Sequence, residues 1–115
     1  MTVVLLSGDL AVLSRVEGAA SDIGQRVRSV STESQAVEFC EENNAKILIV
    51  DLSMPSLDLA GLVSQLKTNE NSRTRIVAFG PHVHEQRLVA ARAAGCDLVV
   101  SRGQFFSQLE TILKR

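Results

Sequence analysis

Apolar positions along the chain follow two alternating patterns, short continuous runs and longer stretches in which apolar residues recur every three or four positions. The continuous runs are typical of strands buried on both faces, and the second pattern predicts helices with one apolar face. We expect five strands, at residues 3–6, 27–30, 47–50, 76–79 and 98–100. The strand at 27–30 is predicted mainly from its place between two helices.

A helix is expected after each strand. The first three helices have good N-cap residues in Asp9, Thr32 or Ser31, and Asp58. We expect the fourth helix over residues 83–94, ended by Gly95. After the last strand, Ser101-Arg102-Gly103 is expected to form a turn, and a terminal helix follows with an apolar stripe at Phe105, Phe106, Leu109, Ile112 and Leu113.

This order, strand then helix five times over, predicts a parallel sheet covered by helices on both faces. The crossovers between parallel strands are right-handed. We expect the α/β, flavodoxin-like fold, a doubly wound five-stranded sheet with strand order 2-1-3-4-5. The length of 115 residues fits one domain, over residues 1–115.

Composition narrows the function classes. Apolar residues make up 45% of the chain and the net charge is −1, so no concentrated basic face is expected and direct nucleic-acid binding is disfavoured. No apolar run approaches the roughly 20 residues of a membrane span, and no signal peptide is expected, which favours a cytoplasmic protein. Cys40 and Cys96 lack metal-ligand spacing and are expected to be small core residues.

Polar residues follow several of the predicted strands, and in sheets of this type sites form outside the carboxyl ends of the strands. Asp51 directly follows the apolar run at 47–50. It is expected at one rim with Ser7, Gly8, Asp9, Ser53, Gly80 and Arg102. From the residues alone, Asp51 either reacts or only caps a loop by accepting backbone N–H bonds.

Two segments, ILIVDLSMPSLD at 47–58 and AAGCDLVVSRGQF at 93–105, resemble the receiver domain of bacterial two-component response regulators. The resemblance covers essentially the whole chain in length and element order. It implies a CheY-like fold, a role in phosphorelay signal transduction, and Asp51 at the phosphoacceptor position.

The chain departs from the family at other active-site positions. The places of the acidic pair that holds Mg²⁺ in receivers are occupied by Ser7 and Gly8, and the switch Thr or Ser is replaced by Gly80. The Lys-Pro pair after the fifth strand is replaced by Arg102-Gly103, and residues 98–100 contain no switch aromatic. The resemblance therefore implies an atypical receiver without a metal-ligand set, because one carboxylate is a weak magnesium site.

Two residues leave alternatives open. Asp9 is expected to cap the first helix, and the alternative is that it turns inward toward a metal. Arg102 either pairs with Asp51 through its planar guanidinium, or it is exposed or faces a partner.

The remaining polar residues are weaker candidates. His82 and His84 are expected to be surface residues, and Arg87 and Arg92 to form a solvated face of the fourth helix. Of the adjacent Phe105 and Phe106, only one can point fully inward. We see no catalytic triad and no phosphate-binding glycine loop, and Ser53 replaces the second Asp of haloacid dehalogenases.

Two functional hypotheses follow. In the first, the chain is a non-enzymatic protein–protein interaction module without a cofactor, which docks on a histidine kinase or an output protein through residues 83–113 and contacts neither nucleic acid nor membrane. In the second, Asp51 is a working phosphoacceptor that a histidine kinase phosphorylates by a metal-poor route, with Mg²⁺ as cofactor only in this case. The sequence leaves the oligomeric state open.

Overall fold

The computed structural model describes residues 2–69 and 72–115. Its five strands are β1 (Thr2–Leu6), β2 (Arg26–Val30), β3 (Ile47–Asp51), β4 (Arg75–Gly80) and β5 (Leu98–Ser101). All neighbouring strands are parallel, and their order is β2-β1-β3-β4-β5. The predicted flavodoxin-like sheet is confirmed, including the weakly predicted strand β2.

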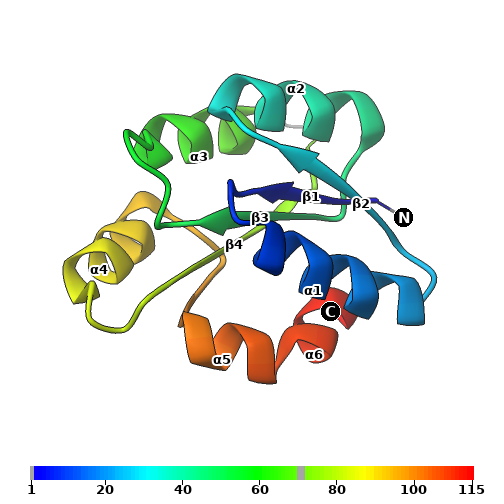
Figure 1. Cartoon of the computed structure of the whole chain (residues 1–115). Coiled ribbons are helices and arrows are strands. Elements are labelled where there is room, and N and C mark those ends of the chain that lie inside the picture. The colour runs from blue at the N-terminus through cyan, green and yellow to red at the C-terminus, as the bar shows by residue number, and fades with distance from the viewer. Residues whose placement is uncertain (1, 70–71) are drawn as a thin grey trace.

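The helices cover both faces of this sheet (Figure 1). They are α1 (Leu10–Asp22), α2 (Glu33–Asn43), α3 (Leu59–Thr68), α4 (Glu85–Ala94), α5 (Arg102–Ser107) and α6 (Leu109–Lys114). Helices α2 and α3 lie on one face, and α1, α5 and α6 lie on the other. In the part of the chain that the structure describes, no helix combines the length and apolar character that a membrane span needs.

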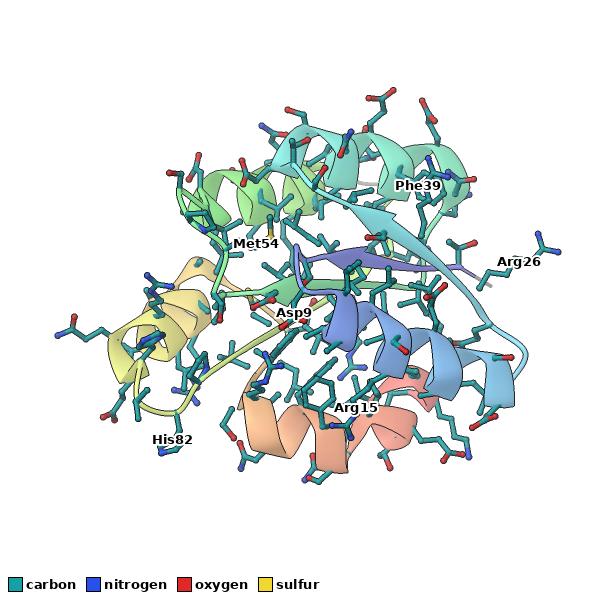
Figure 2. The ribbon with its side chains drawn as sticks, in the orientation of Figure 1. Asp9, Arg15, Arg26, Phe39, Met54 and His82 are labelled. Carbon is teal, nitrogen blue, oxygen red and sulfur yellow. The ribbon has the colours of Figure 1, made fainter. Side chains whose placement is uncertain are left out.

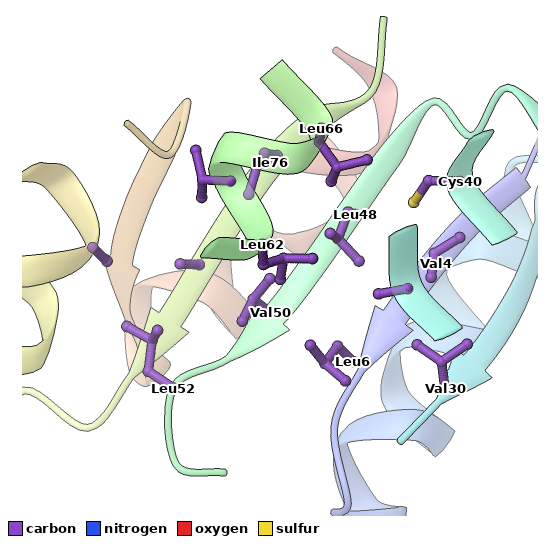
Figure 3. Close-up of a cluster of buried hydrophobic side chains, with 14 of the residues drawn as sticks. Val4, Leu6, Val30, Cys40, Leu48, Val50, Leu52, Leu62, Leu66 and Ile76 are labelled. Carbon is purple, nitrogen blue, oxygen red and sulfur yellow. The ribbon is translucent and has the colours of Figure 1, made fainter. Parts of the chain in front are cut away.

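The alternation of side chains along the central strands divides the core in two. In β3, Leu48 and Val50 face α2, α3 and α4, whereas Ile47 and Ile49 face α1, α5 and α6. Figure 3 shows the first cluster, where Leu62 and Leu66 of α3 pack over β3. Because successive residues of a strand point to opposite faces, a strand buried on both faces must be apolar throughout, as β3 is up to its last residue.

The predicted caps are confirmed. The side chains of Asp9, Thr32 and Asp58 accept backbone N–H bonds at the starts of α1, α2 and α3. Gly95 ends α4 at a φ of 100°, a left-handed conformation that glycine adopts without steric cost.

Two predicted boundaries around the turn before α4 were wrong. Helix α4 begins at Glu85 and not at residue 83, because the chain first makes a turn in which the His84 N–H donates to the Pro81 carbonyl. The fourth strand ends at Gly80, one residue later than expected, and Gly80 pairs with Ser101 of β5. Val83, expected in the helix, is 73% exposed in that turn.

The end of the chain also differs from the prediction. Ser101 closes β5 and caps α5 in a reciprocal pair of hydrogen bonds with Gln104. Arg102 and Gly103 are therefore the first residues of a helix and not part of a turn. The terminal helix is divided at Gln108 into α5 and α6.

Candidate functional site

The carboxyl ends of the strands bring most of the predicted site residues to one rim, whereas Gly80 ends β4 and is not in the lining of the hollow there. A shallow hollow at this rim is lined mainly by Gly8, Asp9, Asp51, Ser53, Met54 and Arg102. Asp9 and Met54 lie at this end of the sheet in Figure 2. Ser7 lies beneath the hollow and is buried.

Asp51 is the last residue of β3, and it is only 3% exposed. Its Oδ2 accepts a hydrogen bond from the Ser7 hydroxyl at 2.8 Å, and its Oδ1 accepts from the Ser53 backbone N–H at 2.9 Å. The Ser7 Oγ in turn accepts from the Asp9 backbone N–H at 3.1 Å. Both carboxylate oxygens of Asp51 therefore have a protein partner, as the loop-capping alternative requires.

Asp9 is committed to the start of α1. Its Oδ1 accepts from the backbone N–H groups of Ala11 at 2.9 Å and Val12 at 3.4 Å. These two bonds, and then the nearby Arg102 guanidinium, hold the pKa of Asp9 below its ordinary value, while slight desolvation acts in the opposite direction. Asp9 is thus the helix cap that the sequence predicted.

Arg102 reaches across the rim from α5. Its Nη2 lies 3.4 Å from Asp9 Oδ2, and both side chains are about two-fifths exposed, at 38% and 41%. In the described chain the guanidinium therefore pairs with Asp9 and not with Asp51. The same guanidinium carbon lies 5.3 Å from the centroid of the Phe106 ring.

Gly80 lies against Leu52, so a side chain at position 80 would contact the Leu52 side chain. A Cβ atom added to Gly80 would lie 3.2 Å from the Leu52 Cβ. Two hydrogen bonds fix the backbone of Leu52. Its N–H donates to the Phe79 carbonyl, and its carbonyl accepts from Arg87 Nη1, each at 2.9 Å. The space above β4 is therefore filled by a fixed leucine.

The bond from Arg87 to Leu52 corrects the sequence interpretation of α4. Arg87 is an exposed residue, but its guanidinium joins α4 to the loop that follows Asp51. The two residues are 35 positions apart, and nothing in the local pattern distinguishes Arg87 from Arg92. Only the packing of α4 against β4, β5 and α3 identifies it.

The other candidates behave mostly as predicted. Phe105 is fully buried and stacks on Phe79 with ring centroids 4.2 Å apart, while Phe106 is half-buried. His82 and His84 are exposed. Cys40 is buried and Cys96 half-buried, and burial raises the pKa of their thiols to about 12 and about 11, so both stay protonated at neutral pH.

The family model of the response regulator receiver domain matches residues 4–114. A comparison with curated proteins gave no match. The structure resembles a response regulator from Hahella chejuensis with a TM-score of 0.84 and 17% identity, over 98% of this chain and 92% of that chain. It also resembles the CheY-like protein TadZ from Pseudomonas aeruginosa with a TM-score of 0.76 and 20% identity, over 100% of this chain and 98% of that chain.

A third similar structure is the receiver domain of a sensor histidine kinase from Pseudomonas aeruginosa, which has a magnesium ion coordinated in its active-site cleft. Its TM-score is 0.80 and its identity 22%, over 99% of this chain and 94% of that chain. These structural likenesses show the fold, and the family model covers nearly the whole sequence. The chain therefore belongs to the response regulator receiver domain family.

Proposed function

We propose that this chain acts in phosphorelay signalling as an atypical receiver, a non-enzymatic module that binds other signalling proteins without metal-dependent phosphotransfer. The observation that carries the proposal is the hydrogen bond from the buried Ser7 hydroxyl to Asp51 at 2.8 Å. A neutral donor stands there in place of an acidic neighbour. The Asp51 carboxylate is already satisfied by the protein, without a cation.

The residues at the rim do not fit the magnesium ion that the family implies. Mg²⁺ requires near-octahedral oxygen coordination and is usually held by carboxylates. Asp51 is the carboxylate that is bonded to the Ser7 hydroxyl, and the carboxylate of Asp9 is used by the α1 backbone and Arg102. Over residues 2–69 and 72–115, no three His, Cys, Asp or Glu side chains are grouped so that they could hold a metal ion.

This chain also lacks the two residues through which receivers transmit phosphorylation, the switch hydroxyl and the switch aromatic. Gly80 has no hydroxyl, and Leu52 fills the space in which a side chain at position 80 would stand. The four residues of β5 are Leu98, Val99, Val100 and Ser101, without an aromatic side chain. A phosphoryl group on Asp51 would therefore need another route to affect the rest of the domain.

The proposed docking surface is the face formed by residues 83–113, and the proposed partner is a histidine kinase or an output protein. Val83 is 73% exposed and Val89 on α4 is 53% exposed. Both side chains expose apolar area that a partner would bury, which favours association by the hydrophobic effect.

The competing hypothesis is a phosphoacceptor that works with little or no metal. Its support is the position of Asp51 at the end of β3, beside a hollow that Arg102 also lines. In that reaction Asp51 attacks the phosphorus of a phosphoryl donor, and the bond from phosphorus to the leaving group breaks. With acetyl phosphate as the donor, acetate leaves.

One experiment separates the two hypotheses. The protein is incubated with acetyl phosphate or beryllofluoride, with and without Mg²⁺, and is followed by intact mass and by amide chemical shifts. We expect no gain of a phosphoryl group and no shift at the rim, in the wild type as in the Asp51→Asn control. A phosphoryl group that appears in the wild type and is absent from Asp51→Asn would overturn the proposal, and its dependence on Mg²⁺ would show whether metal takes part.

A further inference from the structure

We propose that a groove between α1 and α5 binds an acidic segment of a partner protein. The groove is lined by Arg15, Pro81, His82, Arg102, Gly103 and Phe106, and we call it the α1–α5 groove. The inference rests on the proposed role as an interaction module and adds the chemistry of the partner. Figure 2 shows Arg15 between α1 and α5, and His82 on the loop before α4.

Arg15 has no acidic partner in the described chain. Its guanidinium carbon lies 4.0 Å from the centroid of the Phe106 ring, and no ion pair among residues 2–69 and 72–115 involves it. Side chains three and four positions away are its neighbours on a helix, and these are the apolar or small residues Ala11, Val12, Gly18 and Ala19. The charge of Arg15 is therefore uncompensated within α1.

Arg102 lies over the same ring and is only weakly paired. Its guanidinium carbon is 5.3 Å from the Phe106 centroid, and its contact with Asp9 is 3.4 Å long. A charge-assisted N–H···O bond of full strength is about 2.7–2.9 Å long. Two arginines thus approach one phenylalanine, and their N–H groups have few acceptors in the protein.

Stacking on an aromatic ring leaves the edge of a guanidinium available for hydrogen bonds. The donors of this planar fork match the two oxygens of a carboxylate. No acidic residue lines the α1–α5 groove, although the net charge of the whole chain is −1. The groove is therefore complementary to a negatively charged group.

A protein segment fits the α1–α5 groove better than a nucleic acid. Phe106 and Pro81 supply an apolar border that would contact aliphatic side chains next to an acidic residue. Binding to a phosphate backbone needs an extended basic face, whereas the cationic side chains here are confined to Arg15 and Arg102.

The test is an amide NMR titration with a short synthetic peptide of alternating Glu and Leu residues, in the presence of a chelator and without a phosphoryl donor. We expect shifts at Arg15, Arg102 and Phe106 that weaken with added salt. The same peptide with Gln in place of Glu should leave these amides unshifted. If both peptides bind equally, the proposal is wrong.

Matched variants locate the binding site. Arg15→Gln should weaken peptide binding by about fivefold, the upper range for one exposed ion pair, and Arg15→Lys should bind with intermediate affinity because it keeps the charge without the planar fork. Arg26→Gln is the control, because Arg26 is an exposed arginine on β2 that lies away from the groove in Figure 2. Equal loss in Arg15→Gln and Arg26→Gln, or no loss in either, would contradict the proposal.

Two further titrations complete the test. The first identifies the class of ligand, and the second distinguishes peptide binding at the groove from phosphorylation of Asp51. Stronger shifts at the groove amides with inorganic phosphate or a single-stranded oligonucleotide than with the acidic peptide would overturn the assignment to a protein segment. The titration is repeated in Asp51→Asn, where peptide binding should be unchanged. Failure of the peptide to bind leaves the acetyl phosphate result intact, and phosphorylation of Asp51 leaves the peptide result intact.

Discussion

The hydroxyl of Ser7 donates a 2.8 Å hydrogen bond to Oδ2 of Asp51, joining the ends of β1 and β3 inside the rim of the sheet. Both residues are buried. A buried carboxylate loses its hydration and needs hydrogen-bond donors in exchange. The Ser7 hydroxyl and the Ser53 N–H supply these donors. The hydrogen bonds at the rim therefore contribute to the stability of the fold.

Replacing Ser7 with Ala should destabilise the protein by about 1–3 kcal/mol, because the substitution leaves a buried carboxylate oxygen without its donor. The free energy of unfolding from urea titration measures the change. Ser53→Ala is the matched control: Ser53 binds Asp51 through its backbone N–H, so its stability should stay within about 0.5 kcal/mol of the wild type. Equal stability of Ser7→Ala and Ser53→Ala would refute this role of the Ser7 hydroxyl.

Restoring two acids beside Asp51 should create the magnesium site that the rim does not provide. A Cβ atom on Gly8 meets no atom within 4 Å, so Ser7→Asp combined with Gly8→Asp places two carboxylates at the rim. Without metal, their repulsion with Asp51 should lower the melting temperature. Added Mg²⁺ should then stabilise the variant by about 2.7 kcal/mol at about 100-fold above the dissociation constant.

The control for this variant is Ser7→Asn combined with Gly8→Asn, which has similar size without the charge. Neither the control nor the wild type should change its melting temperature when Mg²⁺ is added, and thermal unfolding monitored by circular dichroism measures all three proteins. A wild-type protein that Mg²⁺ stabilises as strongly as the acidic variant would show that Asp51 suffices for metal binding.

The two glycines Gly80 and Gly18 should respond to alanine in opposite directions. At Gly80 the new Cβ would lie 3.2 Å from the Cβ of Leu52, which hydrogen bonds to β4 and α4 hold in place. Gly80→Ala should therefore cost about 1 kcal/mol or more through overpacking. At Gly18, inside α1, a Cβ meets nothing within 4 Å, and alanine should stabilise the helix by about 0.5–1 kcal/mol.

Denaturant unfolding of both variants tests this pair. A stabilised Gly80→Ala would mean that Leu52 gives way easily, and that a side chain at position 80 is compatible with the present rim. A destabilised Gly18→Ala would contradict the open surroundings of that position on α1.

Asp97 should make stability depend on acid pH. Its Oδ2 accepts from the Ile76 N–H and its Oδ1 from Lys67, each at 2.8 Å. Burial acts to raise the pKa of Asp97, but these hydrogen bonds and the Lys67 charge outweigh it, so the net pKa is lowered. A depressed pKa contributes stability above the pKa of the unfolded chain, which is lost as the pH falls through the folded value.

The comparison is between the wild type and Asp97→Asn, which keeps an acceptor for Ile76 but has no titrating charge. The decrease in unfolding free energy from pH 7 to pH 3 should be smaller in Asp97→Asn than in the wild type. Asp22→Asn, at an exposed carboxylate at the end of α1, serves as the control. Identical pH profiles in the wild type and Asp97→Asn would exclude this contribution.

The sequence by itself determined the fold and the place of the candidate site. Runs such as Ile47–Val50 are apolar at every position because both faces of a central parallel strand are covered, and the alternation with amphipathic helices predicts the layers. The caps Asp9 and Asp58 were readable because a side chain that bonds N–H groups two or three residues away is a local interaction. The rim followed from topology, since parallel strands end at the same edge.

The tertiary structure alone decided which side chains meet. The pairs Ser7–Asp51 and Arg87–Leu52 lie 44 and 35 residues apart, and no local periodicity records such distances. Strand register and helix packing also placed Arg102 beside Asp9 and left Arg15 above Phe106. Sequence patterns predict helices and strands because the interactions that stabilise these elements are between residues close in sequence. The partner of a charged side chain depends instead on how elements distant in sequence pack together.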